Sequence, residues 1–361
     1  MTTESQSDKL LIDRYEPRET GVIVIEPQVV EARISPCGRM LAAAGYDARV
    51  RIWSLDGPTP VELNSISGHN GWVHSVVFHP TQPIVFSADS WGQLRATRIE
   101  EGVPLTAWMH ANAHDGWIRQ IDLSPDARLL VSSAPDKRIC LWSPESGALL
   151  AELRDHNEDV QSVRFSPDGK LLASGDAKGK VRLWDLASRR CTQELDATEL
   201  WLLHRLQDVG GVRVLRFNHD SSMIACGGVK PANGGTVQGE PTLLVFDVAT
   251  GQKKSSIQFG EQKDCQLHDV YWTEDNVLMG VTCGTPGTGK VVFQRLGDEK
   301  PFYETTKLPN CQSLSYHAGS KLMAVMTTNR NSNGNGRRLN KSGQYEGNNS
   351  PVHLFQLGKQ A

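Results

Sequence analysis

Residues 113–142 read AHDGWIRQIDLSPDARLLVSSAPDKRICLW, and residues 155–185 read DHNEDVQSVRFSPDGKLLASGDAKGKVRLWD. The two stretches follow one pattern, because each begins near a histidine and ends near a tryptophan, Trp142 or Trp184. The two tryptophans lie 42 residues apart. A repeat of this period is typical of stacked supersecondary units, none of which can bury its apolar face alone.

The pattern within each unit predicts four short strands. Residues 160–167 (VQSVRFSP) alternate apolar and polar side chains, which is the period of a strand with one buried face. The Pro-Asp-Gly sequence at 167–169 is typical of a tight turn, because proline fixes φ and glycine accepts positive φ. The remaining strands of this unit are predicted at residues 170–176, 181–186 and 190–195.

The pattern resembles the WD-repeat β-propeller family, whose units carry a Gly-His pair before the first strand and a Trp-Asp pair in the third. In this sequence the histidine follows Gly68, Ala113 or Asp155. The resemblance implies an all-β fold, a single seven-bladed β-propeller of four-stranded antiparallel blades. It covers about residues 21–358, and it is carried by the first four units and extended to the last three.

Seven first-strand patterns support this count. They begin at Val29, Val73, Ile118, Val160, Val212, Leu267 and Cys311. The last unit supplies only three strands of its own, so we predict that residues 21–27 (GVIVIEP) form its fourth strand and close the ring. Residues 1–20 are polar and of mixed charge, and we expect them to form a flexible N-terminal arm.

The resemblance also implies a hydrogen-bonded polar set in each complete blade. The matching residues are His114, Ser132, Asp136 and Trp142 in one blade, and His156, Ser174 and Trp184 in the next. A buried set of this kind stabilises a fold only when every member is satisfied, so we assign these residues a structural role and not a catalytic one. In the unit that begins at Val73, Thr97 replaces the tryptophan and Trp91 stands where the turn aspartate is expected. That set is predicted to be incomplete.

The regular pattern breaks in three places. Within residues 196–211, Leu200, Leu203 and Leu206 recur at helical spacing, which predicts a short helix. Two further insertions are expected near residues 230–240 and 329–350.

The last insertion is rich in asparagine and almost without apolar residues, so we expect it to be mobile. Its basic side chains would suit an acidic partner. They are Arg330, Arg337, Arg338 and Lys341, set against Glu346.

Composition limits the classes of function. The 361 residues have a net charge of −3, so no strong field favours nucleic acid or acidic membrane as a partner. No apolar run reaches the roughly 18 residues of a membrane span, and the N-terminus does not read as a signal peptide. The seven cysteines form no CxxC pair, which argues against a zinc site and a disulfide framework. We therefore expect a cytoplasmic monomer without cofactor or metal.

Residues 284–290 (GTPGTGK) match a phosphate-binding loop in letters only. Such a loop needs a helix behind it and a serine or threonine after the lysine, whereas Val291 follows here and residues 291–296 read as a strand. We interpret the stretch as a loop between two strands.

Three tryptophans are the candidate binding residues. Trp72 and Trp117 directly precede the first strands of neighbouring units, and Trp91 lies in a loop between second and third strands. In the family both kinds of loop lie on one face, and exposed tryptophans are common at binding hot spots. Arg119 and Asp159 occupy comparable rim positions and would add specificity. The alternative is that each tryptophan folds down against a neighbouring loop.

The resemblance implies a non-catalytic scaffold that binds a protein or peptide on this face. The alternative is a propeller enzyme with a small-molecule site at the mouth of the central channel. We favour the scaffold, because the sequence has no paired carboxylates or metal-ligand cluster with the spacing of an enzyme site. All three insertions are predicted to emerge on the same face as the tryptophans.

Overall fold

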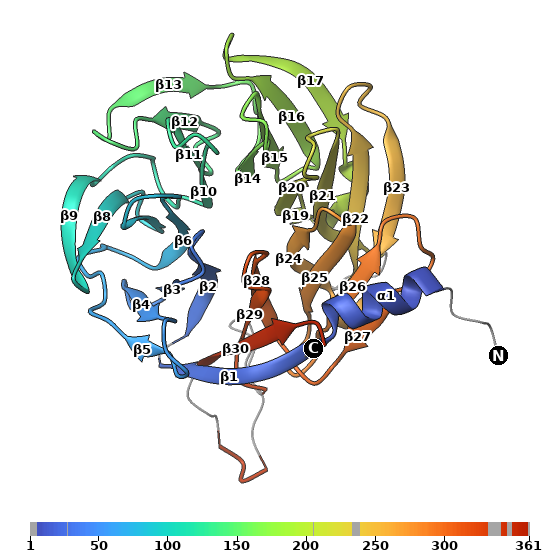
Figure 1. Ribbon diagram of the computed structural model, residues 1–361. Coiled ribbons are helices and arrows are strands. Elements are labelled where there is room, and N and C mark those ends of the chain that lie inside the picture. Colours follow the sequence, from blue (N-terminus) through green and yellow to red (C-terminus); the bar gives the residue numbers. More distant parts are fainter. Residues whose placement is uncertain are drawn as a thin grey trace.

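The computed structural model describes residues 6–26, 28–204, 206–232, 239–330, 341–344 and 349–359. Within them the chain forms seven four-stranded sheets, which are arranged as blades around a central axis (Figure 1). Neighbouring strands of each blade pair antiparallel. This confirms the predicted seven-bladed β-propeller. In the described residues no helix is long and apolar enough to span a membrane.

Blades 1 to 4 follow the repeat that the sequence shows. In each of them the first strand is innermost and the fourth is outermost (Figure 1). The strands are β2 (Val29–Ile34), β3 (Met40–Gly45), β4 (Val50–Ser54) and β5 (Val61–Glu62); β6 (Val73–Phe78), β7 (Ile84–Asp89), β8 (Leu94–Glu100) and β9 (Val103–His110); β10 (Gln120–Leu123), β11 (Leu130–Ser133), β12 (Ile139–Trp142) and β13 (Leu149–Leu153); and β14 (Val160–Phe165), β15 (Leu171–Asp176), β16 (Lys180–Asp185) and β17 (Arg190–Asp196).

Blades 5 and 6 keep the same order although their repeats are degenerate. Phe246 and Phe293 fill the tryptophan position of the third strand, and both are buried. The strands are β20 (Val214–Phe217), β21 (Met223–Pro231), β22 (Gly239–Asp247) and β23 (Lys253–Gln258); then, after the 3₁₀ turn η2 (Gln262–Asp264), β24 (Gln266–Trp272), β25 (Val277–Cys283), β26 (Val291–Arg295) and β27 (Tyr303–Thr305).

The GTPGTGK stretch joins two strands of blade 6, as interpreted from the sequence. It connects β25 to β26, and no helix follows it. Lys290 Nζ lies 2.8 Å from Glu304 Oε1, so its charge is paired within the sheet.

The ring closes with a strand from the other end of the chain. Blade 7 has the order β1-β30-β29-β28, in which β1 (Pro17–Ile25) is outermost and β30 (Ser350–Leu357), β29 (Leu322–Thr327) and β28 (Cys311–His317) follow inward. Pro17 pairs with Leu357 and Ile25 with Ser350, and Figure 1 shows β1 running along β30. This confirms the predicted closure.

The described part of residues 1–20 is not a structureless arm. Residues 6–15 form helix α1 (Gln6–Tyr15), and β1 begins at Pro17. The segment is held because Tyr15 is buried and its hydroxyl donates to Asp275 Oδ2 at 2.7 Å, while Arg14 pairs with the same carboxylate. The predicted flexible arm is therefore wrong from residue 6 onward.

The helix predicted near residues 200–206 is also wrong. A 3₁₀ turn, η1 (Thr198–Leu200), leads into a hairpin of β18 (Trp201–His204) and β19 (Gln207–Gly210). Of the three leucines only Leu200 is buried, and Leu206 is 95% exposed. The leucines therefore do not form the buried apolar face that would stabilise a helix here. Across the hairpin Trp201 Nε1 donates to Asp208 Oδ1 at 2.8 Å.

The hydrophobic core lies between neighbouring blades. Val131 and Leu141 of blade 3, for example, share a cluster with Val163 and Trp184 of blade 4. Ile25 packs in a cluster that joins blade 7 to blade 1. The innermost strands contact one another in chain order, and β28 contacts β2. These strands therefore line the axis and position whatever lies there.

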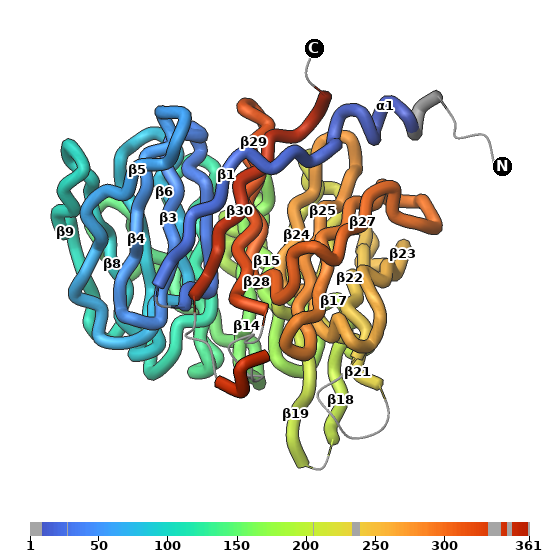
Figure 2. Tube along the Cα trace, turned by 90° about the horizontal axis from the view of Figure 1, so that it is seen from below, coloured from blue at the N-terminus to red at the C-terminus, as the bar shows by residue number. Residues whose placement is uncertain are grey.

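The β18–β19 hairpin projects from one face of the propeller, and α1 lies toward the opposite face (Figure 2). The hairpin leads directly into β20, so its face is the one on which the innermost strands begin. The described parts of the other two insertions, at the junctions β21–β22 and β29–β30, leave their sheets at the same end. Residues 233–238, and Arg337, Arg338 and Glu346 in the last insertion, lie outside the described residues.

Candidate binding site at the channel mouth

In blade 3 four side chains are linked in series by hydrogen bonds. His114 Nδ1 lies 2.9 Å from Asp136 Oδ2, and His114 Nε2 lies 2.7 Å from Ser132 Oγ. Trp142 Nε1 donates to the same hydroxyl at 2.8 Å. Burial alone would raise the pKa of Asp136, but the hydrogen bond and charge of His114 outweigh it and hold that pKa far below its ordinary value. His114, Ser132 and Trp142 are buried and Asp136 is half-buried, so the set links the loop before β10 to β11, to β12 and to the turn between them.

Blade 4 has the same chain. His156 Nδ1 lies 2.9 Å from Asp176 Oδ2, and Nε2 lies 2.7 Å from Ser174 Oγ. Trp184 Nε1 donates to Ser174 Oγ at 2.8 Å. In both blades Nδ1 of the histidine faces a carboxylate, which only accepts, so in the neutral ring Nδ1 donates and Nε2 accepts from the serine hydroxyl. None of these groups is free to act as a nucleophile.

Blade 2 lacks only the tryptophan of this chain. His69 Nε2 lies 2.7 Å from Ser87 Oγ, and Nδ1 lies 3.1 Å from Asp89 Oδ2. The prediction that Trp91 takes the place of the aspartate is wrong, because Asp89 supplies the carboxylate two residues after the serine, as Asp176 does. Within the described residues the buried Thr97 Oγ1 has no hydrogen-bond partner.

The second position of each first-strand pattern forms a ring at one end of the channel, here called the bulge ring. In five blades the pairing with the second strand skips this residue, which is a β-bulge that turns its side chain out of the ladder. In blades 3 and 5 it directly precedes the strand. In chain order the ring is Val30, His74, Arg119, Gln161, Arg213, His268 and Gln312.

All seven residues of the bulge ring line one cavity of about 300 Å³, here called the channel-mouth cavity. This size is that of a small ligand site. Its lining includes four arginines, at 33, 119, 164 and 213, but only two carboxylates, Glu31 and Asp269. The cavity is therefore positively charged at neutral pH.

The two imidazoles of the ring are neutral at physiological pH. Burial lowers the pKa of His74 to about 4, and the charges of Arg119 and Arg213 act in the same direction. Burial also lowers the pKa of His268 to about 4, where Arg213 and His74 add to the effect and Asp269 opposes it. His74 Nδ1 lies 3.2 Å from the carbonyl oxygen of Arg119 and donates to it, which fixes the tautomer of the neutral ring.

An aromatic cluster borders the cavity. The rings of Tyr46 and Trp72 lie 4.9 Å apart, and those of Trp72 and Trp117 lie 6.1 Å apart, edge to face. Trp117 also meets His74, and the guanidinium of Arg119 lies 4.3 Å from the Trp117 ring. Trp117 is half-buried, so it has folded against its neighbours, whereas Trp72 keeps 48% of its surface exposed.

Trp91 and Asp159 flank this cluster. Trp91 is 69% exposed and lies against Gly71, whose missing side chain leaves room for the indole. Burial lowers the pKa of Arg119, and the negative charge of Asp159, which directly precedes β14, opposes that shift. The structure thus brings all five predicted binding residues to one side of the mouth.

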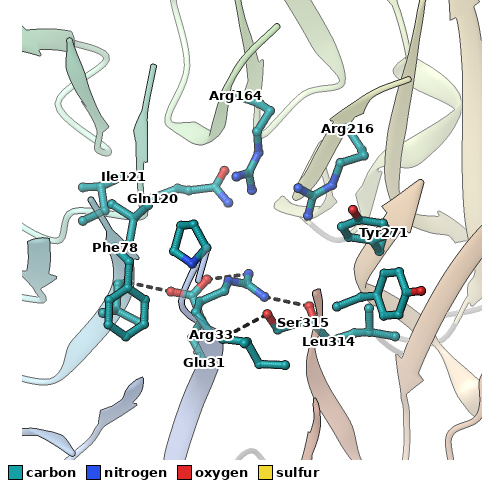
Figure 3. Close-up of a pocket in the computed structure, with 15 residues that line it drawn as sticks. Glu31, Arg33, Phe78, Gln120, Ile121, Arg164, Arg216, Tyr271, Leu314 and Ser315 are labelled. Atoms are coloured by element: carbon teal, nitrogen blue, oxygen red, sulfur yellow. Dashed lines mark hydrogen bonds and ion pairs between the residues drawn. The ribbon is translucent and has the colours of Figure 1, made fainter. Parts of the chain in front are cut away.

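Next along the axis, Arg33, Arg164 and Arg216 point into a second, smaller pocket of about 150 Å³ (Figure 3). Arg33 bonds Glu31 Oε1 and Asp269 Oδ2, both at 2.6 Å, and Arg216 lies 3.5 Å from Asp269. Arg164 pairs with Asp122 at 3.0 Å. These carboxylates also accept backbone N–H groups of the neighbouring blade, as Glu31 does from Val76 at 2.6 Å. These ion pairs tie blades together, and their charges are matched.

Sequence reasoning missed most of the bulge ring. It singled out Arg119 but not His74, Gln161, Arg213 or His268. The signal was present, because aligning the seven first-strand patterns puts these residues in one column. The bulge that turns this column toward the axis is visible only in the pairing register. In the described residues no group of three or more His, Cys, Asp or Glu could hold a metal ion.

The family model for the WD domain, G-beta repeat, matches residues 27–54, 60–95, 108–143 and 147–185, which run across blades 1 to 4. The protein is a β-propeller that carries WD repeats. Among known proteins, Protein HIR1 of Phaeosphaeria nodorum is 29% identical over 147 residues, which cover 37% of this chain and 14% of that protein. The guanine nucleotide-binding protein subunit beta of Dictyostelium discoideum is 29% identical over 124 residues, or 34% of this chain and 35% of that subunit.

Apoptotic protease-activating factor 1 of Rattus norvegicus is 30% identical over 111 residues, which cover 29% of this chain and 9% of that protein. In all three cases the match spans well under half of the relative. The similarity therefore reports shared repeats.

Proposed function

We propose that this propeller is a non-catalytic scaffold that binds a protein or peptide on the face that carries Trp72, Trp91 and the channel-mouth cavity. The observation that carries the proposal is the exposure of two neighbouring indoles on a rigid frame. Trp72 is 48% exposed and Trp91 is 69% exposed, so folding leaves much of their apolar surface in water. A partner that covers this surface would gain the free energy of burying it.

The elaboration of the same face supports the proposal. The β18–β19 hairpin and the long β21–β22 hairpin rise beside the mouth, and loops carried on a rigid scaffold are where binding sites are usually built. The WD repeats point the same way, since propellers of this family are typically protein-interaction modules. One relative is named as a subunit, that is, as a member of an assembly.

The test compares variants of the full chain that keep their stability. We expect Trp72→Ala and Trp91→Ala each to weaken partner binding by about 2 kcal/mol if they are hot-spot residues. Melting temperatures should change little, because both side chains already lie largely in solvent. The matched control is Leu105→Ala, which removes a similarly exposed apolar side chain from the outermost strand β9.

Candidate partners come from affinity capture in the native cell, followed by titration of the purified partner against each variant. The proposal requires a partner that binds the wild type and the Leu105 variant but not the Trp72, Trp91 double variant. If every recovered partner binds the double variant with unchanged affinity, this face is not the binding face.

A further inference from the structure

The bulge ring is symmetric in its chemistry around Gln161. From blade 2 to blade 6 the residues are His74, Arg119, Gln161, Arg213 and His268. Two arginines thus flank a central amide, and a neutral imidazole flanks each arginine. We call these five residues the cationic arc.

The two arginines of the arc lack carboxylate partners. The other arginines of the channel are matched, Arg33 by Glu31 and Asp269, and Arg164 by Asp122. No ion pair within 4 Å joins Arg119 or Arg213 to a carboxylate of the described residues. Arg213 is instead held by a neutral group, because the Gln266 amide, with its oxygen turned toward Arg213, accepts from Nη1 and Nε at 3.1 Å.

The two guanidinium groups also disfavour each other. Desolvation lowers the pKa of Arg213, and the charge of Arg119 adds to that effect. Both side chains line the open channel-mouth cavity, where Arg119 is half-buried and Arg213 keeps an exposed surface. Two like charges that have no carboxylate at ion-pair distance cost free energy, and the more distant charge of Asp159 offsets this only in part at Arg119. An anion between them would remove that cost.

Several of the buried hydrogen-bonding groups that have no partner among the described residues belong to side chains at this cavity. Trp117 Nε1, Arg119 Nε and Arg164 Nε are such N–H donors, and Gln161 Oε1 is an acceptor whose amide can turn its NH₂ group to the cavity instead. All four residues line the channel-mouth cavity. Most buried donors in proteins are paired, so three unpaired donors at one cavity indicate a ligand that accepts hydrogen bonds. Acceptor-only ligands of this kind are carboxylates and phosphoryl groups, which arginine binds with two parallel bonds.

We propose that the channel-mouth cavity binds an oxyanion, a carboxylate or a phosphoryl group, that the partner peptide inserts between Arg119 and Arg213. The inference rests on the proposed function, because it takes the oxyanion from a partner held by Trp72 and Trp91. The aromatic cluster covers the peptide, and the cationic arc reads its acidic side chain. The Trp117 indole, stacked on Arg119, belongs to both.

The first experiment needs no partner. The full chain is titrated with sodium phosphate, sodium sulfate and sodium glutamate, with sodium chloride at matched ionic strength as the reference. The readout is the indole N–H resonance of Trp117, which is identified among the nine tryptophans by its loss in Trp117→Phe. We expect a saturable shift with a phosphate or carboxylate salt and none with chloride.

Variants then separate the site from general electrostatics. Arg119→Gln and Arg213→Gln should each weaken oxyanion binding about tenfold or more. The matched control is Arg128→Gln, which removes an arginine whose side chain is 86% exposed in the turn between β10 and β11. Gln161→Glu places a carboxylate between the two arginines without a change of size, so it should abolish oxyanion binding while the protein remains folded and as stable as the wild type.

If sulfate and phosphate bind and glutamate does not, the ligand group is a phosphoryl group. If glutamate binds and sulfate and phosphate do not, the ligand group is a carboxylate. The proposal is overturned if no oxyanion gives a saturable shift, or if Gln161→Glu and Arg128→Gln bind oxyanions equally well. The two proposals fail separately. A partner lost in the Trp72, Trp91 double variant but indifferent to Gln161→Glu would overturn only the oxyanion site. Saturable oxyanion binding without any partner would overturn the scaffold and the peptide as the source of the oxyanion, but not the oxyanion site itself.

Discussion

His74 and Arg119 occupy the same register position in neighbouring blades, and His74 Nδ1 donates to the carbonyl oxygen of Arg119 across 3.2 Å. The contact joins the neutral imidazole of His74 to the backbone of Arg119, whose side chain is one of the two cations of the arc. It also means that protonation of His74 would place a third positive charge beside Arg119 and Arg213. The acid stability of the propeller should reveal this arrangement.

The free energy of unfolding should fall as the pH is lowered from 6.5 to about 4. His74 and His268 have folded-state pKa values of about 4 against 6.5 when unfolded, with Arg119, Arg213 and Asp269 as the charged neighbours. In this window the unfolded chain binds more protons than the folded chain, so acid favours unfolding. Each imidazole should contribute on the order of 2–3 kcal/mol.

Urea denaturation at several pH values checks this prediction. The double variant His74→Gln, His268→Gln should show a flatter dependence in the window, and His219→Gln, an exposed control, should match the wild type. The carboxylate of Asp269 has a pKa below 3.8 and so acts below the window. An unchanged slope in the double variant would show that these imidazoles are not held neutral.

Removal of residues 1–25 should destabilise the whole ring. The deletion takes away β1, which pairs with β30 from Pro17 to Ile25, and it removes the buried Ile23 and Ile25 from the junction of blades 7 and 1. It leaves β30 as an open edge, which invites association with other chains. Thermal melting with light scattering is the measurement, and removal of residues 1–5 is the control. A deletion that melts at the wild-type temperature without aggregating would disprove the closure argument.

Tyr15→Phe should cost about 1 kcal/mol of stability. The substitution removes the hydroxyl that donates to Asp275 Oδ2 at 2.7 Å but keeps the buried ring beside Phe302. Since Asp275 lies in the turn between β24 and β25, the contact pins α1 to blade 6. Chemical denaturation measures the loss. The prediction fails if the variant is as stable as the wild type, because α1 would then be only loosely held.

Trp142→Phe should cost about 1–3 kcal/mol, because it deletes the indole donor to Ser132 Oγ and leaves that buried hydroxyl one bond short. The same substitution at Trp184 should cost a similar amount, since its indole makes the same bond to Ser174 at 2.8 Å. Equilibrium denaturation of both variants is the check. A loss in only one blade would mean that the hydrogen-bonded chains are not equivalent.

Thr97→Val should raise stability by roughly 1 kcal/mol. Thr97 is buried, and its hydroxyl has no hydrogen-bond partner in the described structure, so replacing the hydroxyl with a methyl group removes a desolvation cost at constant shape. Thr242→Val is the matched control, because the buried Thr242 hydroxyl donates to the Glu240 carbonyl at 3.0 Å. The control should lose stability; a loss at Thr97 as well would show that its hydroxyl is satisfied.

The sequence alone determined the architecture of this protein. Alternating strands, the Pro-Asp-Gly turn at 167–169 and the 42-residue spacing from Trp142 to Trp184 are local signals, because strand and turn preferences depend on neighbours along the chain. The repeat also places Trp72, Trp91 and Trp117 in loops that the structure brings close together. The leucines near residue 203 do not form the helix that their spacing predicts, since such spacing produces a helix only where another element can cover the apolar side.

The cationic arc was decided by tertiary structure. His74, Arg119, Gln161, Arg213 and His268 are separated from one to the next by 42 to 55 residues along the chain, and they differ in residue type although they share one position of the repeat. They meet because bulges and strand starts turn one residue of each blade toward the axis, and because ring closure brings all blades to the same centre. An arginine near the axis is paired only if another blade places a carboxylate beside it, as Asp122 does for Arg164 and Asp269 does for Arg33. The local sequence around the arginine does not predict such a contact.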